Sequence, residues 1–225
     1  MHVALILHSD QTTGRLDDAL ALEGARVDRY LIHRTEPIPS DVDFDRVVIL
    51  GGAMGAYEED HHPWLADEKK WLRALVEAEV PVLGICLGSQ MLASALGGEV
   101  YPAARPEAAV ISLQYTEEGR ADPVLSSAGG QVLALHKDTF DLPPEAVLLA
   151  ESALYPHAFR VGSALALQFH PDADLEQARR WGHEESGLLE EAGVSLDEFA
   201  ADLERSDRAL DAGSRRIFGA WLGSV

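Results

Sequence analysis

The sequence predicts an α/β fold in which a doubly wound, mostly parallel sheet is flanked by helices and followed by a helical C-terminal extension. Three observations predict it. Short apolar runs alternate with amphipathic helical stretches in the first part of the chain, polar or glycine-rich turns end those runs, and only helical patterns follow residue 174. Parallel strands joined by helices are buried on both faces, and they are therefore continuously apolar.

The first half of the chain supplies the expected parallel strands. Four apolar runs are interpreted as buried strands: 2–9, 25–33, 44–52 and 80–86. Sites in doubly wound sheets lie at the carboxyl ends of the strands. Gly51, Gly52 and Cys86 all fall at such ends, so this edge of the sheet is where a site is expected.

A helix is predicted between the last two of these strands, over residues 63–79. It begins with Pro63, which is tolerated in a first helical turn. Its apolar residues share one face: Trp64, Leu65, Trp71, Leu72, Leu75 and Val76. Its charged residues are expected to point outward: Asp67, Glu68, Lys69, Lys70, Arg73 and Glu77.

The second half adds strands that extend or flank the central sheet. They are predicted at 109–116, 131–136, 146–152 and 158–170, with a glycine-containing turn at 161–163 in the last. The tail repeats apolar residues at helical spacing: Phe199, Leu203, Leu210, Ile217, Phe218 and Trp221. We therefore expect a domain over residues 1–175 and a helical extension over 176–225 that packs on the same domain.

Composition narrows the functional classes. The 225 residues carry a formal net charge of −20, which argues against nucleic acid and anionic membranes as partners. The single cysteine allows no internal disulfide, and no apolar run approaches the ~20 residues of a membrane span. The start MHVALILHSD has no basic region or cleavage site. We expect a soluble, cytoplasmic protein.

Cofactor and metal motifs are weak. The glycine pairs at 97–98 and 129–130 lack a GxGxxG or P-loop pattern, so no cofactor is expected. His61 and His62 stand beside acidic residues, but adjacent histidines point in different directions. A solvated loop bordering the active site is the preferred interpretation, and no metal site is predicted.

The single cysteine lies in the stretch PVLGICLGSQ, residues 81–90. A lone cysteine at the end of an apolar run can be a small buried hydrophobe. However, Gly84 and Gly88 frame Cys86 as they would in a nucleophile elbow, where a strand turns sharply into a helix. The following helix, over about 89–96, would direct its positive end toward Cys86 and favour the thiolate.

A base for this thiol is found in QFHPD, residues 168–172. His170 ends an apolar strand at the level of Cys86, and Asp172 follows two residues later. Together with the thiol, these side chains supply a nucleophile, a proton shuttle and a group that orients the imidazole. Taken alone, a histidine at a strand end is more often a satisfied surface residue.

Three segments together resemble the class I, or triad, glutamine amidotransferases: GGAMGAYEED (51–60), LGICLGSQMLASALGGEV (83–100) and LQFHPD (167–172). The closest resemblance is to the stand-alone branch similar to the glutaminase domain of GMP synthetase, which HKDTFDLPPEAVLLAES (136–152) also resembles. The resemblance covers about residues 1–175 and implies a flavodoxin-like fold without a cofactor.

The resemblance also implies roles for individual residues. Cys86 would attack the side-chain carbonyl of glutamine, His170 would move the proton, and Asp172, where the family usually has Glu, would orient His170. Backbone N–H groups of Gly52 and Leu87 match the oxyanion-hole positions. Gln90 matches a position that contacts the substrate, although an amide at a helix start is equally suited to a solvated cap.

Three functions remain open. The first is hydrolysis of glutamine or of a γ-glutamyl compound through a cysteinyl thioester, with release of ammonia or an amine. The second is a glutaminase subunit that is active only with a separate synthase partner. The third, raised by the shorter side chain of Asp172, is a catalytically weak regulatory or binding homologue.

Overall fold

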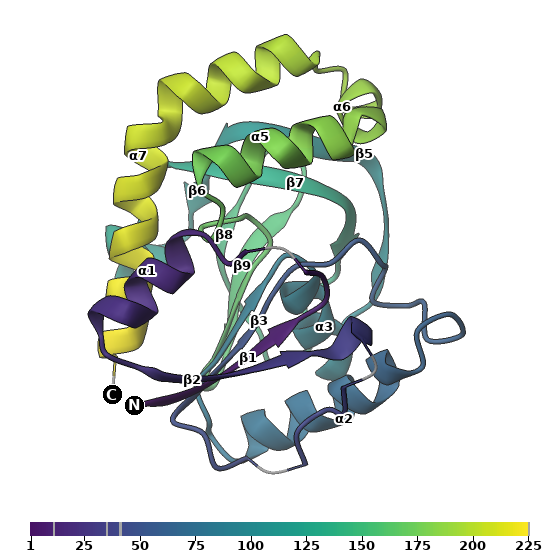
Figure 1. The fold of residues 1–225 in the computed structure, drawn as a ribbon, viewed down its shortest axis with the longest axis vertical. Coiled ribbons are helices and arrows are strands. Elements are labelled where there is room, and N and C mark those ends of the chain that lie inside the picture. Colours follow the sequence, from purple (N-terminus) through teal and green to yellow (C-terminus); the bar gives the residue numbers. More distant parts are fainter. Residues whose placement is uncertain (11, 35, 41, 225) are drawn as a thin grey trace.

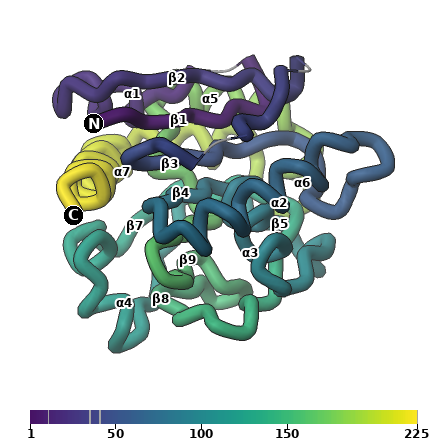
Figure 2. The backbone as a smooth tube through the Cα atoms, turned by 90° about the horizontal axis from the view of Figure 1, so that it is seen from below, coloured from purple at the N-terminus to yellow at the C-terminus, as the bar shows by residue number. Residues whose placement is uncertain are grey.

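A computed structural model describes residues 1–10, 12–34, 36–40 and 42–224, and its central feature is an eight-stranded sheet (Figure 1). The strands lie in the order β2 (Arg26–Leu31), β1 (His2–Leu7), β3 (Arg46–Ile49), β4 (Val82–Ile85), β10 (Ala164–Leu167), β9 (Pro156–Val161), β8 (Val147–Glu151) and β6 (Gln114–Tyr115). Figure 2 shows β2, β1, β3 and β4 following one another across the sheet. The predicted α/β fold class is confirmed.

The sheet is parallel from β2 to β10 and antiparallel beyond it. β1 pairs with β2 and β3, and β4 pairs with β3 and β10, all in parallel. β9 and β10 form an antiparallel hairpin whose turn contains Gly162 with a φ of +53°. This hairpin confirms the turn predicted at 161–163. Glycine suits the turn because it adopts a positive φ without a steric penalty.

Two further strands form a separate antiparallel pair beside the main sheet. They are β5 (Val100–Ser112) and β7 (Gln131–Phe140), and their register shifts between Pro102 and Glu107. The prediction that second-half strands extend or flank the sheet is therefore confirmed: β6, β8 and β9 extend it, and this pair flanks it.

Helices cover both faces of the sheet. They are α1 (Arg15–Leu22), α2 (Trp64–Glu77), α3 (Leu87–Ala95), α4 (Glu117–Ala121), α5 (Leu175–Glu184), α6 (Ser186–Ala192) and α7 (Leu196–Gly223), with short 3-10 turns at Ile32–Arg34 and Leu125–Ser127. Side chains alternate along β1. Val3 and Leu5 pack in a core with residues of α1 and α7, while Ala4 and Ile6 pack in a core with residues of α2 and α3.

The prediction that all the charged residues of α2 point outward is partly wrong. Glu68 and Lys69, expected to point outward, have relative exposures of 0% and 8%. Each is buried because it has a charged or polar partner: Glu68 contacts His8, and the Lys69 ammonium lies 2.6 Å from a Glu59 carboxylate oxygen. The other four charged residues of that face are exposed, as predicted.

Helix α7 packs against β1 and α1. Helix α7 begins with a capping box between Ser195 and Glu198, and its Trp221 lies in the same core as residues of β1. Arg15 of α1 forms an ion pair of 2.6 Å with Asp207 of α7. Figure 1 shows α5, α6 and α7 gathered on one side of the molecule, opposite α2. The boundary at residue 175 stays a prediction.

Among the helices that the structure describes, none combines the length and the apolar character needed to cross a bilayer.

Candidate active site

Cys86 occupies a strained turn between β4 and α3. Its φ of 52° and ψ of −110° are unusual for a residue with a side chain; Glu79 is the other non-glycine residue with a positive φ in the described part of the chain. The backbone N–H of Cys86 donates to the carbonyl of Leu167, and its carbonyl accepts from the Ser89 hydroxyl at 2.7 Å. This geometry places the thiol at the carboxyl ends of β4 and β10.

The glycines around Cys86 permit close packing of this turn. A Cβ atom on Gly84 would lie 2.5 Å from the carbonyl oxygen of Gly88, and one on Gly88 would lie 2.2 Å from the carbonyl oxygen of Ile49. Both distances are too short for any side chain. The prediction that these glycines relieve crowding at the elbow is confirmed.

His170 and Asp172 follow the end of β10 and lie beside the thiol. The Nδ1 atom of His170 is 3.2 Å from the Oδ1 atom of Asp172, and both side chains are buried. His170 and Cys86 line the same cavity and both lie close to Gly51. Its backbone N–H donates to the carbonyl of Leu133 at 2.8 Å, which ties it to β7. Cys86, His170 and Asp172, which were predicted as a catalytic group from the sequence, therefore lie together at the carboxyl ends of β4 and β10.

The electrostatics of this group favour a charged imidazole. Burial lowers the pKa of His170, but attraction to Cys86 and to Asp172, with a hydrogen bond to Asp172, outweighs burial and raises that pKa to about 10. An imidazolium at neutral pH is the partner that stabilises a thiolate.

Gly51 and Gly52 form the opposite wall, just after β3. A Cβ atom on Gly51 would lie 3.2 Å from Cε1 of His170 and 4.0 Å from Sγ of Cys86. One on Gly52 would lie 2.7 Å from Cδ2 of Leu87. A side chain at Gly51 would crowd His170, and one at Gly52 would clash with its neighbours, so the backbone of Gly51 lies close beside His170 and Cys86.

A cavity of about 230 Å³ opens onto these groups. Besides Cys86, His170 and Asp172, its walls include His8, Gly51, Gly52, Gln90, Asp138, Trp181, Glu184, Glu185 and Leu188. The last four come from α5, α6 and the turn between them, so the C-terminal extension contributes to the site. Its size suits a small molecule.

Trp181 and His8 are among the wall residues that were not predicted from the sequence. The ring of Trp181 lies 4.7 Å from that of His170, centroid to centroid. His8 lies one residue after the end of β1. The position of His8 at a strand end was a usable signal, because sites of this fold class gather there. Nothing in the local pattern distinguishes Trp181 from a packing residue.

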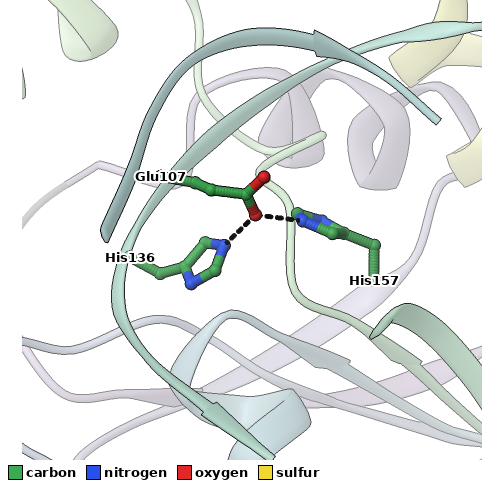
Figure 3. Close-up of side chains that lie close together, drawn as sticks. All are labelled: Glu107, His136 and His157. Carbon is green, nitrogen blue, oxygen red and sulfur yellow. Dashed lines mark hydrogen bonds and ion pairs between the residues drawn. The ribbon is translucent and has the colours of Figure 1, made fainter. Parts of the chain in front are cut away.

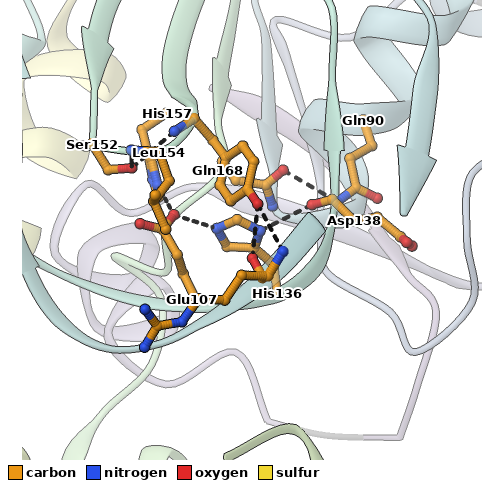
Figure 4. Close-up of polar contacts among 10 residues, drawn as sticks. Gln90, Glu107, His136, Asp138, Ser152, Leu154, His157 and Gln168 are labelled. Atoms are coloured by element: carbon orange, nitrogen blue, oxygen red, sulfur yellow. Dashed lines mark hydrogen bonds and ion pairs between the residues drawn. The ribbon is translucent and has the colours of Figure 1, made fainter. Parts of the chain in front are cut away.

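Gln90 is buried on the cavity wall, with a relative exposure of 3%. Its side-chain amide donates to the carbonyl of Asp138 at 3.3 Å and to Oε1 of Gln168 at 3.2 Å (Figure 4). The solvated-cap alternative is therefore excluded. Contact of Gln90 with a substrate stays a prediction.

Glu107, His136 and His157 form a buried cluster (Figure 3), and His136 also lines the cavity. One oxygen of Glu107 lies 3.1 Å from Nε2 of His136 and 2.7 Å from Nε2 of His157. Burial raises the pKa of Glu107, but the two histidine hydrogen bonds outweigh it and hold that pKa well below its usual range. The ligand-type atoms lie within 4.8 Å of one another, so these three described residues could hold a metal ion.

The family can be assigned now that the site is described. The family model "Glutamine amidotransferase class-I" matches residues 5–181. The chain therefore belongs to the class I glutamine amidotransferase family, as the three motifs predicted. Membership of this family supports an enzyme that hydrolyses glutamine.

Individual relatives agree with this assignment. One subunit of the glutamine-hydrolyzing GMP synthase of Methanothermobacter thermautotrophicus is 32% identical over 160 residues, which cover 64% of this chain and 78% of the relative. The glutamine-hydrolyzing GMP synthase of Thermomicrobium roseum is 35% identical over 149 residues, covering 61% of this chain but only 26% of the relative. The chain thus spans about a quarter of that longer protein.

A solved structure resembles the whole chain. A glutamine amidotransferase from Thermotoga maritima superposes with a TM-score of 0.87 and 29% identity, covering 100% of this chain and 99% of the other. The C-terminal helices are therefore included in the structural match.

Proposed function

We propose that the protein hydrolyses the side-chain amide of glutamine or of a γ-glutamyl compound through a thioester on Cys86. The observation that carries this proposal is the arrangement of His170, which contacts Asp172 through Nδ1 and lines the same cavity as Cys86. Nucleophile, proton carrier and orienting carboxylate are thereby within reach of one another at the cavity.

In the first half of the reaction, the Cys86 thiolate forms a bond to the side-chain carbonyl carbon, and the carbonyl electrons move to oxygen. His170 gives a proton to the amide nitrogen as the oxyanion collapses. The carbon–nitrogen bond breaks, ammonia leaves, and a γ-glutamyl thioester remains on Cys86. From a γ-glutamyl conjugate, an amine leaves instead.

In the second half, water attacks the thioester carbon while neutral His170 accepts a proton from it. The carbon–sulfur bond breaks, glutamate leaves, and the thiolate facing an imidazolium is restored. Asp172 keeps Nδ1 of His170 as a donor, so that the other ring nitrogen faces the reacting atoms.

Stabilisation of the oxyanion is assigned to the N–H groups of Gly52 and Leu87. Leu87 begins α3, where backbone N–H groups have no partner within the helix, and Gly52 lies on the cavity wall. A donor of this kind typically contributes about 3 kcal/mol to transition-state stabilisation.

A separate synthase partner is a second proposal. It is favoured by the relative from Methanothermobacter thermautotrophicus, which is named as one subunit of a GMP synthase. In that case ammonia released at Cys86 would pass to a partner protein rather than into solution.

The deciding experiment measures ammonia release from glutamine and amine release from γ-glutamyl peptides by the isolated protein, with Cys86→Ala as the control. Cys86-dependent turnover by the isolated protein supports the hydrolase. Turnover that requires an added synthetase component of GMP synthase supports the second proposal. Absence of turnover under both conditions supports the regulatory homologue.

A further inference from the structure

The cluster of Glu107, His136 and His157 connects the two-stranded pair to the eight-stranded sheet. Glu107 of β5 and His136 of β7 are register partners within the pair, whereas His157 lies on β9 of the main sheet. Their relative exposures are 8%, 4% and 0%, so the cluster is shielded from solvent. Both imidazole rings are directed at the same carboxylate oxygen (Figure 3).

The contacts of His136 require a cation in this cluster. Its Nδ1 atom lies 2.9 Å from the carbonyl oxygen of Asp138, which only accepts, so Nδ1 carries the single proton of a neutral ring. The other nitrogen, Nε2, then presents a lone pair to the Glu107 carboxylate oxygen 3.1 Å away, and both of these atoms are acceptors. Either a second proton on His136 or a metal ion beside the two atoms removes this conflict.

The surroundings of His136 are those of a metal ligand. A histidine that binds a metal through one ring nitrogen commonly donates the N–H of the other to a backbone carbonyl or a carboxylate, which fixes the ring and its tautomer. The Asp138 carbonyl is such an acceptor. His157 presents a second Nε2 atom, 2.7 Å from the same oxygen of Glu107. Its Nδ1 atom is buried without a hydrogen-bond partner in the described part of the chain, so no contact there forces a proton onto Nε2.

The spacing and the chemistry of these atoms select a class of metal. Ligand atoms at about 2.0–2.1 Å from a tetrahedral zinc ion lie ~3.3 Å from one another. The His136 contact of 3.1 Å is close to that separation, and the His157 contact of 2.7 Å needs to lengthen by ~0.6 Å. Two imidazole nitrogens with one carboxylate suit zinc and similar divalent transition metals, whereas calcium and magnesium prefer oxygen ligands.

We propose that Glu107, His136 and His157 bind one divalent transition-metal ion of the zinc class, which joins the β5–β7 pair to the main sheet. The ion takes the place of the protons through which the two histidines otherwise bond to Glu107, so hydrogen bonds hold the cluster together in the metal-free protein. None of the three ligands belongs to the catalytic group, and the role of the ion is structural.

The metal site also supports one wall of the cavity. The Asp138 carbonyl that accepts from His136 also accepts from the side-chain amide of Gln90 at 3.3 Å (Figure 4). Gln90, His136 and Asp138 all line the cavity, and the last two lie on β7. An ion that holds His136 in place therefore holds this part of β7 beside Gln90.

Zinc binding is measured in a Cys86→Ala background, because the thiolate beside His170 is itself a pair of zinc ligands. The proteins are freed of metal with EDTA, the chelator is removed, and Zn²⁺ is added in a calorimetric titration. The Cys86→Ala protein should bind one ion per chain. Adding Glu107→Gln or His157→Gln should weaken binding by ~10²-fold or more, because each removes a ligand. His61→Gln, at an exposed histidine outside the cluster, is the matched control and should bind like the background protein.

Absence of zinc binding by the Cys86→Ala protein, or equal affinity in all of these variants, would overturn the proposal. A second measurement does not depend on whether the cluster variants fold. In crystals of the Cys86→Ala protein grown with Zn²⁺, anomalous diffraction at the zinc edge should show a peak between Glu107, His136 and His157. Peaks at surface sites alone would overturn the proposal. Both measurements are independent of the proposed function, since the catalytic thiol has been removed.

Discussion

The Nδ1 atom of His170 lies 3.2 Å from the Oδ1 atom of Asp172, and the backbone between them is anchored from two helices. The carbonyl of Pro171 accepts a hydrogen bond of 2.6 Å from the Ser214 hydroxyl of α7, and the carbonyl of Asp172 accepts one of 2.9 Å from the N–H of Arg15. This anchoring brings the short aspartate side chain within reach of the imidazole.

Replacing Asp172 with asparagine should abolish most activity. Asp172→Asn keeps the size of the side chain but removes the charge that stabilises the imidazolium and selects the working tautomer, so kcat should fall by ~10³-fold or more. Asp172→Glu, which keeps the charge, should stay within about tenfold of the wild type, as the conservative control. Steady-state kinetics of the three proteins test this. An Asp172→Asn enzyme with wild-type kcat would reduce the triad to a dyad at most.

A side chain at Gly52 should disturb the oxyanion site. A Cβ atom there would lie 2.7 Å from Leu87 and Met54 and 2.9 Å from His8. We expect Gly52→Val to lower kcat by ~10²-fold or more, because the backbone must move to relieve these contacts. Gly130→Ala is the matched control, since a Cβ atom at Gly130 would meet no atom within 4 Å. Full activity in Gly52→Val would remove Gly52 from the mechanism.

The charge on His170 should depend on Cys86. Because attraction to Cys86 helps to raise the pKa of His170 to about 10, Cys86→Ser should shift that pKa down toward the ordinary value of 6.5. A raised pKa stabilises the folded protein fully below the ordinary value, and this stabilisation is lost as the pH rises through about 10. Titration of the His170 ring resonances by NMR measures the shift. Identical titration curves in the two proteins would contradict a thiolate–imidazolium pair.

The Glu107 cluster should contribute strongly to stability. Glu107→Ala leaves two buried histidines without their shared acceptor, so the free energy of unfolding should fall by about 3 kcal/mol at neutral pH. Because the pKa of Glu107 is depressed, its contribution is complete above the ordinary value of 4.5 and is lost as the pH falls below it. Urea unfolding of Glu107→Ala and of the exposed control Glu190→Ala measures the difference. Equal losses in both variants would contradict this role.

The features predicted correctly are those that depend on neighbours in the sequence. The glycines beside Cys86 lie within two residues of it, and His170 is two residues from Asp172, so each short motif contains its own part of the site. That the two motifs meet was indicated by their common place at the carboxyl ends of strands. The outward orientation predicted for Glu68 is wrong because its partner His8 is 60 residues away, and helical charge patterning cannot detect such a partner. The Glu107 cluster was missed for the same reason, since its members come from β5, β7 and β9.

Covalent labelling tests most directly that the Cys86 thiolate attacks a glutamine side chain. A diazo-ketone analogue of glutamine reacts with a nucleophile that occupies the position of the attacking group, and free glutamine competes with it. Incubation at neutral pH, followed by intact-mass and peptide mass spectrometry, should find one label on Cys86, slowed by added glutamine and absent from Cys86→Ala. A wild-type protein that stays unlabelled, or a label that persists in Cys86→Ala, would contradict a nucleophilic Cys86.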